Sequence, residues 1–481
     1  MVFKMVEVHI GTKTDKRRSV KDIISVIWKE TSVEPIVVFF TLPFYMSTLA
    51  IQNLSLEKSC RVNLDLNASI CDALQERNTS GYTESEEVAV QKVVAIASIW
   101  KNVINGIFPA ILLLLLGSWS DRNRLRNVLI LIPILGEVVA NVGFLLCTYF
   151  FDELPMEVNT VFEVLPTSVT GGFNMAFLGV FTYISTNTSP INRTFRMGII
   201  QTLFSICVAI GNAISGIMYH AIGFYGVFGV SLLMYILNGF YVYYLLPDDA
   251  RDKEKSLSKC ELFKDVWNIK DTLKSFNFVK KAASSARTRQ IWAILMLEIL
   301  ILGPTVGMMA VLYLYTRLAF NWDEIDYSIF SGYFSVAHLV GNFGAIAIFS
   351  KWLRFDDSII GTMSSISKIV GGIGYTLAKT AVWFYISTLL DAVNGAAIVA
   401  SRSMATKLVS EHDLGKVNSL FGIVDSLAAL IYGPMYSAVY EATIDVLPTA
   451  FNIVGVGLTI PAVLLYVWLY VGRNVRLTEK A

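Results

Sequence analysis

The sequence predicts an all-α membrane protein with twelve transmembrane helices in two six-helix halves. The first observation is composition: 54% of the 481 residues are hydrophobic and 16% are charged, whereas about a quarter of the residues in a soluble chain are charged. The second is pattern, because the apolar residues fall into blocks near the ~20 residues that a membrane-spanning helix needs. The third is a long charged segment near mid-chain, which separates six blocks from six.

The twelve apolar blocks follow one another in order, six in an N-terminal half (33–247) and six in a C-terminal half (291–471). They are expected at 33–53, 93–116, 128–150, 166–186, 195–217, 224–246, 291–316, 327–350, 358–378, 382–403, 418–440 and 447–471. Residues 1–32 are polar, so the first block is expected to act as an uncleaved anchor and not as a signal peptide.

Lysine and arginine predict the orientation of the chain. The N-terminal arm 1–32 carries seven of them, the linker 248–290 eleven and the tail 472–481 three. In contrast, the two loops expected on the outer side are acidic: 152–165 has four acids and no base, and 54–91 has seven acids against three bases. Because basic loops stay on the cytosolic side, both termini and the linker are expected in the cytosol. Both the plasma membrane and an endolysosomal membrane fit this pattern.

The loop 54–91 is therefore expected on the outer side. Asn67 and Asn78 begin Asn-X-Ser sequons there, and Asn53 begins another close to the membrane, so these three asparagines are the predicted glycosylation sites. Cys60 and Cys71 are the two cysteines of this loop, and we expect them to form a disulfide.

A charged motif joins the second and third blocks. The stretch GSWSDRNRLRN, residues 117–127, resembles the signature of the major facilitator superfamily, and two six-helix halves are the layout of that fold. Asp121, Arg122 and Arg126 are therefore candidates for a cytosolic gate, in which Asp121 faces a partner arginine or the positive end of a helix. The alternative is that the turn is only a positive anchor on the inner side.

Three further stretches resemble the proton-coupled folate transporter family, solute carrier family 46. They are NRTFRMGIIQT (192–202), FNWDE (320–324) and SRSMATKLVSEHDLGKVNSLFG (401–422). The resemblance covers most of the chain. It implies a transporter of folates or other organic anions, including muropeptides and sterol or drug conjugates, in some members coupled to protons.

The chain departs from this family at positions that the folate carriers use. The resemblance places Gln201 where they have a proton-handling glutamate, Gly172 where they have an aspartate for the pterin, and Pro304 where they have a histidine. Arg402 matches a family arginine at the inner end of helix ten. Gln201 can form hydrogen bonds but cannot titrate. Muropeptide-like or other conjugated anions are therefore expected ahead of folate.

Ionisable residues inside apolar blocks are independent site candidates, because a charge at the centre of a spanning helix costs about 2.5–3.5 kcal/mol on insertion scales. Such residues are expected to face a cavity or a charged partner. They are Glu137, Glu298, His338, Lys368, Asp391, Arg402 and Asp425.

Asp391 and Arg402 are eleven residues apart in one predicted helix. On a continuous helix they lie on nearly the same face, roughly 16 Å apart along the axis. Our hypothesis is that this face lines the central cavity, where Arg402 attracts an anion and Asp391 handles protons. The alternatives are that Arg402 is an anchor at the inner interface and that Asp391 forms a buried pair with a neighbouring helix.

The other ionisable candidates leave similar alternatives open. Glu298 and Asp425 are either substrate or coupling groups or interfacial acids without a transport role. Lys368 is expected to pair with one of these two. His338 is either a pH sensor or a buried, hydrogen-bonded histidine. Pro304 is expected to break its helix near the middle.

The sequence also limits the function class. It contains no G-x-x-x-x-G-K-[ST], H-E-x-x-H or G-x-S-x-G motif, so no enzymatic activity, cofactor or metal is expected. The expected partners are a small organic anion, protons and the lipid bilayer, with no nucleic acid, and the chain is expected to be a monomer or homodimer. The alternative function is a receptor or scaffold that kept the facilitator fold but does not transport.

Overall fold

The computed structural model describes residues 33–123, 126–187, 190–246, 286–408 and 414–472. The helices of the N-terminal half are α3 (Glu34–Lys58), α4 (Ala68–Gln75), α5 (Glu84–Asn123), α6 (Arg126–Tyr149), α7 (Met156–Val169), α8 (Gly172–Asn187) and α9 (Pro190–Leu245), with a π-helical turn η1 (Ser59–Asn63) after α3. Those of the C-terminal half are α12 (Ala286–Phe320), α13 (Glu324–Ala345), α14 (Asp357–Leu377), α15 (Ala381–Asp391), α16 (Ala396–Leu408), α17 (Leu414–Thr443) and α18 (Ala450–Val471), with a π-helical segment η2 (Ile346–Trp352) after α13. The predicted arm, most of the linker and most of the tail lie outside the described residues.

The helices account for the predicted membrane crossings. Ten described stretches are long and apolar enough to span a bilayer, and one of them, Arg196–Leu245, has 50 residues. It holds two crossings, because Gly223 with φ +62° interrupts the helix between them. Helix α14, with 21 residues, is not among the ten stretches but is long enough to be a further crossing. Dividing the long stretch and adding α14 gives twelve crossings, as the sequence predicts.

Helix α7 corrects the prediction at residues 152–165. We expected an outer loop there because of its acids, but the chain is helical from Met156. Pro155 directly precedes this helix, and Glu157 lies in its first turn, where the helix dipole favours an acidic residue. The connection before it is therefore only a few residues long.

Two crossings are interrupted. Gly171 and Gly172, with φ of +83° and +54°, separate α7 from α8, a backbone conformation that glycine adopts without steric cost. Residues 392–395 separate α15 from α16. In contrast, α12 continues through Pro304 as one helix of 35 residues, so the predicted break at Pro304 is wrong.

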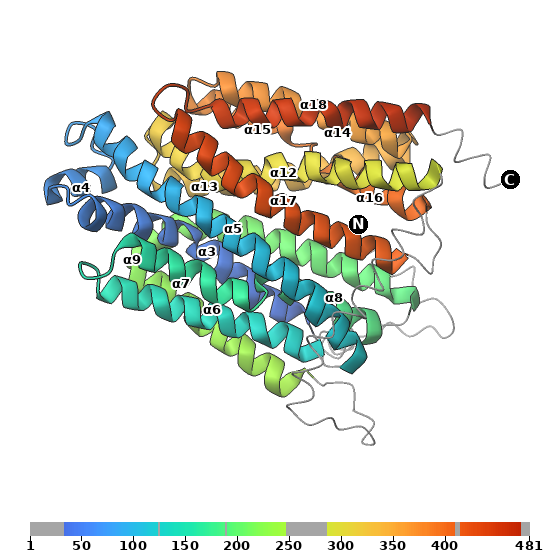
Figure 1. Ribbon diagram of the computed structural model, residues 1–481, viewed down its shortest axis with the longest axis horizontal. Coiled ribbons are helices and arrows are strands. Elements are labelled where there is room, and N and C mark those ends of the chain that lie inside the picture. The colour runs from blue at the N-terminus through green and yellow to red at the C-terminus, as the bar shows by residue number, and fades with distance from the viewer. Residues whose placement is uncertain (1–32, 124–125, 188–189, 247–285, 409–413, 473–481) are drawn as a thin grey trace, which may run out of the picture.

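The long helices run side by side along the molecule, and α4 lies at one end of the bundle (Figure 1), which we call the α4 end. Near this end, small residues let the two halves approach closely. A side chain at Gly216 of α9 would overlap the backbone of Glu324 in α13. Nearer the middle of the bundle, one at Gly433 of α17 would press on Asn102 of α5. The halves are therefore packed together at the α4 end.

Toward the opposite end, the faces of α9 and α17 that contact the other half become exposed. On α9, Asn212 donates a hydrogen bond to Ser335 of α13 at 3.2 Å, but Gln201, three turns farther away from the α4 end, is exposed. On α17, Gly433 is packed, but an added Cβ at Gly422 would have no described atom within 4 Å. The structure is thus closed at the α4 end, whereas Gln201 and Gly422 are exposed farther along the same helices.

Candidate functional site

Arg402 of α16 lies between two carboxylates from other helices. Its Nε donates a hydrogen bond to Glu298 Oε1 of α12 at 2.9 Å, and its Nη2 donates to Asp425 Oδ2 of α17 at 2.8 Å. Ser401 donates a third hydrogen bond to the other oxygen of Glu298 at 2.6 Å. The ring of Phe421 lies 5.4 Å from the guanidinium carbon. We call Arg402, Glu298 and Asp425 the arginine triad.

The exposure of the arginine triad is graded. The Glu298 side chain is fully buried, while those of Asp425 and Arg402 are 33% and 43% exposed. The guanidinium is planar and holds several donors in fixed directions, so one arginine can bind two carboxylates at once. With one cation and two carboxylates the cluster carries one excess negative charge when all three groups are ionised.

This geometry changes two of the sequence expectations. Arg402 is not a free cation in this conformation, because both carboxylates already bind it. Glu298 and Asp425 are its partners and not isolated interfacial acids. Lys368 pairs with neither of them, so the pairing expected for Lys368 is wrong.

Asp391 forms a second buried cluster. Its carboxylate is fully buried, lies 3.3 Å from Lys368 Nζ of α14 and accepts a hydrogen bond from Asn394 at 2.7 Å. His338 Nε2 of α13 lies 3.8 Å from the same carboxylate. The His338 ring packs on Phe334 with centroids 4.1 Å apart, and Nε2 makes no hydrogen bond with any described group. Of the two alternatives for Asp391, the structure contains the buried pair.

The break between α15 and α16 explains why the prediction of one continuous helix face through Asp391 and Arg402 is wrong. Asp391 is the last residue of α15, and Arg402 lies beyond the break in α16. Asn342 of α13 enters the break: its Oδ1 accepts a hydrogen bond from the Ala396 backbone at 3.1 Å, and its side chain packs on Gly395. The Asn-Gly dipeptide at 394–395 is a turn signal that could have predicted this interruption.

The N-terminal half contains an ion pair that sequence reasoning missed. Lys101 of α5 lies 3.0 Å from Glu163 of α7, and each side chain is about a quarter exposed. Lys101 lies inside an apolar block, so it met the criterion for a candidate, and Glu163 had been assigned to a loop. Glu137 of α6 is buried, and its backbone carbonyl accepts a hydrogen bond from Asn141 at 2.9 Å.

Partly exposed aromatic rings line the N-terminal half near the exposed face of α9. Phe173 of α8 stacks on Phe177 with centroids 4.6 Å apart, and it also contacts Phe44 of α3 and Phe204 of α9 at 5.6 and 5.5 Å. Gly172 directly precedes this cluster at a positive φ. Aromatic side chains give a wall that fits the apolar part of a ligand.

In the predicted outer loop, the structure contains the expected disulfide. Cys60 and Cys71 form a disulfide with their Cα atoms 5.9 Å apart, and Asn67 and Asn78 are exposed. Asn53 corrects the prediction. It lies in α3, is 7% exposed and accepts a hydrogen bond from the Tyr313 hydroxyl, so its buried side chain is inaccessible to a glycosyltransferase.

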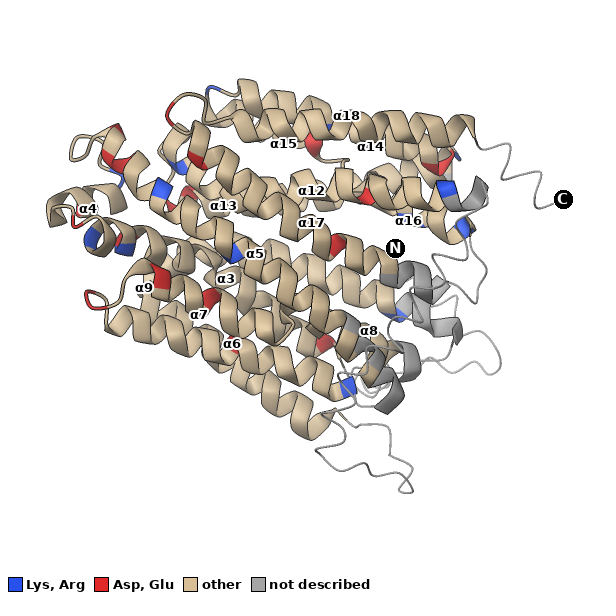
Figure 2. Ribbon diagram, viewed as in Figure 1, with Lys and Arg blue, Asp and Glu red and all other residues tan. Residues whose placement is uncertain are grey.

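The predicted gate lies at the opposite end of the bundle. The backbones of Asp121 and Arg122 continue α5 to Asn123, but their side chains lie outside the described residues. Arg126 begins α6 and is partly buried. Figure 2 shows that described charged residues gather near the α4 end, while others lie singly along the middle of the bundle and near the opposite end.

Comparison with known proteins defines the class. The family model of the Major Facilitator Superfamily matches residues 92–434. The chain therefore belongs to the major facilitator superfamily, and it is a multi-pass membrane protein of a transporter family. The human organic anion transporter MFSD10 (TETRAN) has the same fold, with a TM-score of 0.59, 15% identity, and coverage of 91% of this chain and 98% of that one.

Within that superfamily the chain is similar to solute carrier family 46 proteins. It is 23% identical over 437 residues to the "Probable peptidoglycan muropeptide transporter SLC46" of Drosophila melanogaster, covering 88% of this chain and 82% of the relative. It is 23% identical over 424 residues to the lysosomal proton-coupled steroid conjugate and bile acid symporter SLC46A3 of Gallus gallus, covering 86% and 88%. It is also 23% identical over 401 residues to the proton-coupled folate transporter of Rattus norvegicus, covering 79% and 81%.

Proposed function

We propose that this protein is a secondary active transporter for a conjugated organic anion, muropeptide-like in the first instance, and that protons drive it. The observation that carries the proposal is the arginine triad: a guanidinium that is nearly half exposed and is held by two carboxylates. Arginine is suited to bind carboxylate and phosphate groups in a fixed geometry. The triad therefore combines an anion site with two groups that can accept protons.

The triad supports coupling between the two ligands. An incoming anion must compete with Glu298 and Asp425 for the N–H groups of Arg402. A proton on either carboxylate weakens its hold on the guanidinium and frees donors for the anion. Proton and anion then favour each other's binding, and this mutual effect is reciprocal by linkage. This is the behaviour required of a proton–anion symporter.

Features of the N-terminal half favour a conjugate over folate. The aromatic wall around Phe173 suits the apolar portion of a larger anion. Gln201 and Gly172 lack the carboxylates that the folate-family resemblance implies. Two of the similar proteins are named for muropeptides and for steroid conjugates and bile acids.

The test is uptake of labelled muropeptide, steroid sulfate and folate by cells that display the protein at the surface, at acidic and at neutral pH. We expect acid-stimulated muropeptide uptake, which Arg402→Lys lowers by roughly tenfold, because one bidentate anion contact is lost. Glu298→Gln and Asp425→Asn are expected to flatten the pH dependence. The matched control is Lys407→Gln, which removes an exposed cation from the same helix and should leave uptake unchanged.

The competing function is a receptor or scaffold that does not transport. Confirmed surface expression with saturable muropeptide binding but no flux at either pH would favour it. Robust folate uptake without muropeptide uptake would contradict the proposed substrate while leaving the transporter class intact.

The remaining sequence predictions extend the proposal. We propose that both termini face the cytosol of a plasma-membrane or endolysosomal protein, that Asp121, Arg122 and Arg126 form the gate at the end opposite α4, and that Asn67 and Asn78 carry glycans. The positive-inside pattern supports the first. The exposure of both asparagines supports the last.

A further inference from the structure

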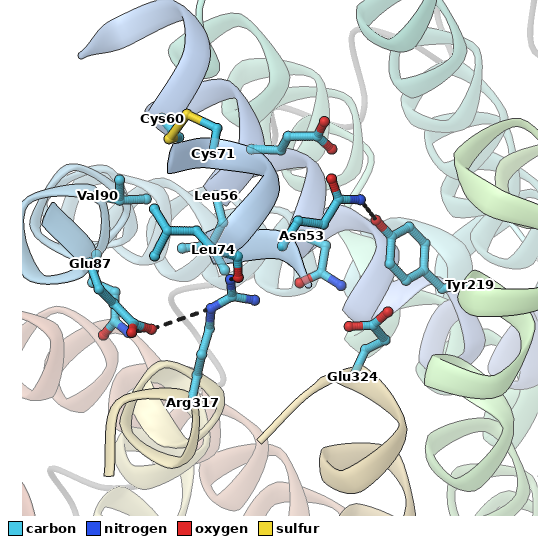
Figure 3. Close-up of a pocket in the computed structure, with 13 residues that line it drawn as sticks. Asn53, Leu56, Cys60, Cys71, Leu74, Glu87, Val90, Tyr219, Arg317 and Glu324 are labelled. Carbon is cyan, nitrogen blue, oxygen red and sulfur yellow. Dashed lines mark hydrogen bonds and ion pairs between the residues drawn. A yellow bond between two sulfur atoms is a disulfide. The ribbon is translucent and has the colours of Figure 1, made fainter. Parts of the chain in front are cut away.

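At the α4 end, three buried charged side chains connect the two halves of the molecule. Arg77, between α4 and α5, lies 2.7 Å from Glu87 of α5, and Arg317 of α12 lies 3.5 Å from the same carboxylate. These side chains are only 5–8% exposed. Arg77 and Glu87 belong to the N-terminal half. Arg317, drawn with Glu87 in Figure 3, belongs to the C-terminal half.

The side chains of both arginines also donate hydrogen bonds to backbone carbonyls across the boundary between the halves. Arg77 Nη2 donates to the carbonyl of Arg317 at 2.6 Å, and Arg317 Nη2 donates to the carbonyl of Leu74 in α4. Asn321, just after α12, donates to the carbonyl of Arg77 at 3.2 Å. The segment that follows α4 is therefore bonded directly to the end of α12 in the other half.

The disulfide fixes this segment in place. Cys71 ties α4 to Cys60 in η1, the turn that follows α3, and Leu74 follows Cys71 by three residues on the same helix. A small cavity lies beneath the segment, with Gln75, Tyr219 and Glu324 among the residues that line it (Figure 3). We call residues 60–77, from the first cysteine to Arg77, the stapled lid.

We propose that the stapled lid closes the transport pathway at the α4 end and that Arg317 is its latch. Opening this end requires the end of α12 to leave the N-terminal half. That movement breaks every bond of Arg317 to Glu87 and Leu74 but leaves Arg77 bound to Glu87.

Both arginines bind the carboxylate of Glu87, and this lowers the energetic cost of opening. Removing one partner of a buried ion pair is costly when the other charge is left uncompensated. Here Glu87 has an arginine partner in both states, since Arg77 moves with it. Arg317 becomes accessible to water as the halves separate, so its charge is solvated there. The lid is held shut by several bonds, yet opening does not leave an isolated buried carboxylate.

The experiment measures opening directly and needs no substrate. A Ser328→Cys reporter is placed at a fully buried position of α13 that faces Gly216 of the other half. Intact cells are treated with a membrane-impermeant maleimide, and the same chain without the reporter gives the background. We expect Arg317→Ala to raise the labelling rate by about threefold or more, because it shifts the population toward the open state.

The control removes a different ion pair between the halves at the same end. Lys92 pairs with Asp445, but their side chains are 33% and 55% exposed, and such exposed pairs contribute little. Lys92→Ala should leave the labelling rate at the level of the reporter alone. If Lys92→Ala raised labelling as much as Arg317→Ala, or if Arg317→Ala left it unchanged, the proposed latch would be wrong.

A second pair of variants tests the lid itself. The double variant Cys60→Ser/Cys71→Ser removes the staple and should raise labelling, though less than Arg317→Ala, because the arginines remain. Arg77→Ala should also raise it less than Arg317→Ala, since the Arg317 bonds to Glu87 and Leu74 persist.

An Ala213→Cys reporter, against Gly332 in the same interface, repeats the measurement in case Ser328→Cys disturbs folding. Equal labelling of the staple-free and stapled chains with both reporters would overturn the role of the lid.

Discussion

Arg402 shows how much of a charged site depends on partners that are far away in the chain. Its two carboxylate partners, Glu298 and Asp425, are 104 and 23 residues away from it in the sequence and lie on other helices. Glu298 is fully buried, so the arginine supplies the positive charge that makes this acid tolerable within the protein.

We therefore predict that Arg402→Met strongly destabilises the protein, by about 3–5 kcal/mol if Glu298 stays ionised. The double variant Arg402→Met/Glu298→Gln should recover part of this loss, because it removes the uncompensated charge. Thermal unfolding of the detergent-solubilised variants measures both effects. Equal melting temperatures for the single and double variants would contradict the prediction.

The Lys368–Asp391 pair gives a contrasting prediction. Because this pair is buried and neutral as a whole, Lys368→Met/Asp391→Asn should be more stable than Lys368→Met alone. We also expect the double variant to retain the acid stimulation of uptake, since the proposed proton site is the arginine triad. Uptake that no longer responds to pH in this double variant would reassign coupling to Asp391.

At this scale the sequence identified most of the charged positions but not their pairing. Their place within apolar blocks marks Glu298, Lys368, Asp391 and Arg402 as costly residues. Which of them meet depends on how four separate helices pack, and no local pattern encodes that. Lys368 was consequently assigned to the wrong acid.

At the scale of elements, the apolar blocks predicted the crossings well, while the interruptions were harder to predict. The α7 region was mistaken for a loop because its acids were counted without considering partners such as Lys101 for Glu163. The break before α16 was missed because an apolar block was taken as one continuous helix. Pro304 was over-weighted, since proline is tolerated within a helix when neighbouring helices stabilise it.

The positive φ at Gly172 leads to a test of the folate-family comparison. Restoring an acid with Gly172→Asp should be tolerated by the backbone, because aspartate is one of the few residues that adopt a positive φ, and Asp65 of this chain does so at +49°. We expect near-normal expression but no gain in folate transport, because Gln201 still lacks the carboxylate that the folate-family resemblance implies. Folate uptake by Gly172→Asp alone, measured beside the wild type, would contradict this prediction.

The outer loop gives a prediction for modification. Asn67→Gln and Asn78→Gln should each increase electrophoretic mobility by the equivalent of one glycan, because both side chains are exposed. Asn53→Gln should not, because Asn53 is buried against Tyr313. Treatment with peptide-N-glycosidase provides the control, since it should bring wild type and all three variants to the same mobility.

At the scale of the whole molecule, the two halves touch through small residues at the α4 end. Gly216→Val should therefore destabilise this closed arrangement, because even a Cβ at this position overlaps the backbone of Glu324. We expect faster maleimide labelling of the Ala213→Cys reporter. Gly457→Val is the matched control, because an added Cβ there would have no described atom within 4 Å.

The two-half architecture and the number of crossings were predictable because length and hydropathy determine them. Which end is closed could not be predicted, since both closed and open arrangements bury the same apolar blocks. That choice depends on a few contacts at the helix ends, such as those of Arg317 and Gly216.

The excess negative charge of the arginine triad also bears on membrane voltage. If one proton and one monovalent anion bind together, the loaded site carries the same charge as the empty one. The membrane potential, worth about 2.3 kcal/mol per charge per 100 mV, would then act equally on the loaded and the returning carrier. Uptake of a monovalent conjugate should be electroneutral and should produce no current, whereas a divalent conjugate carried with a single proton should generate one.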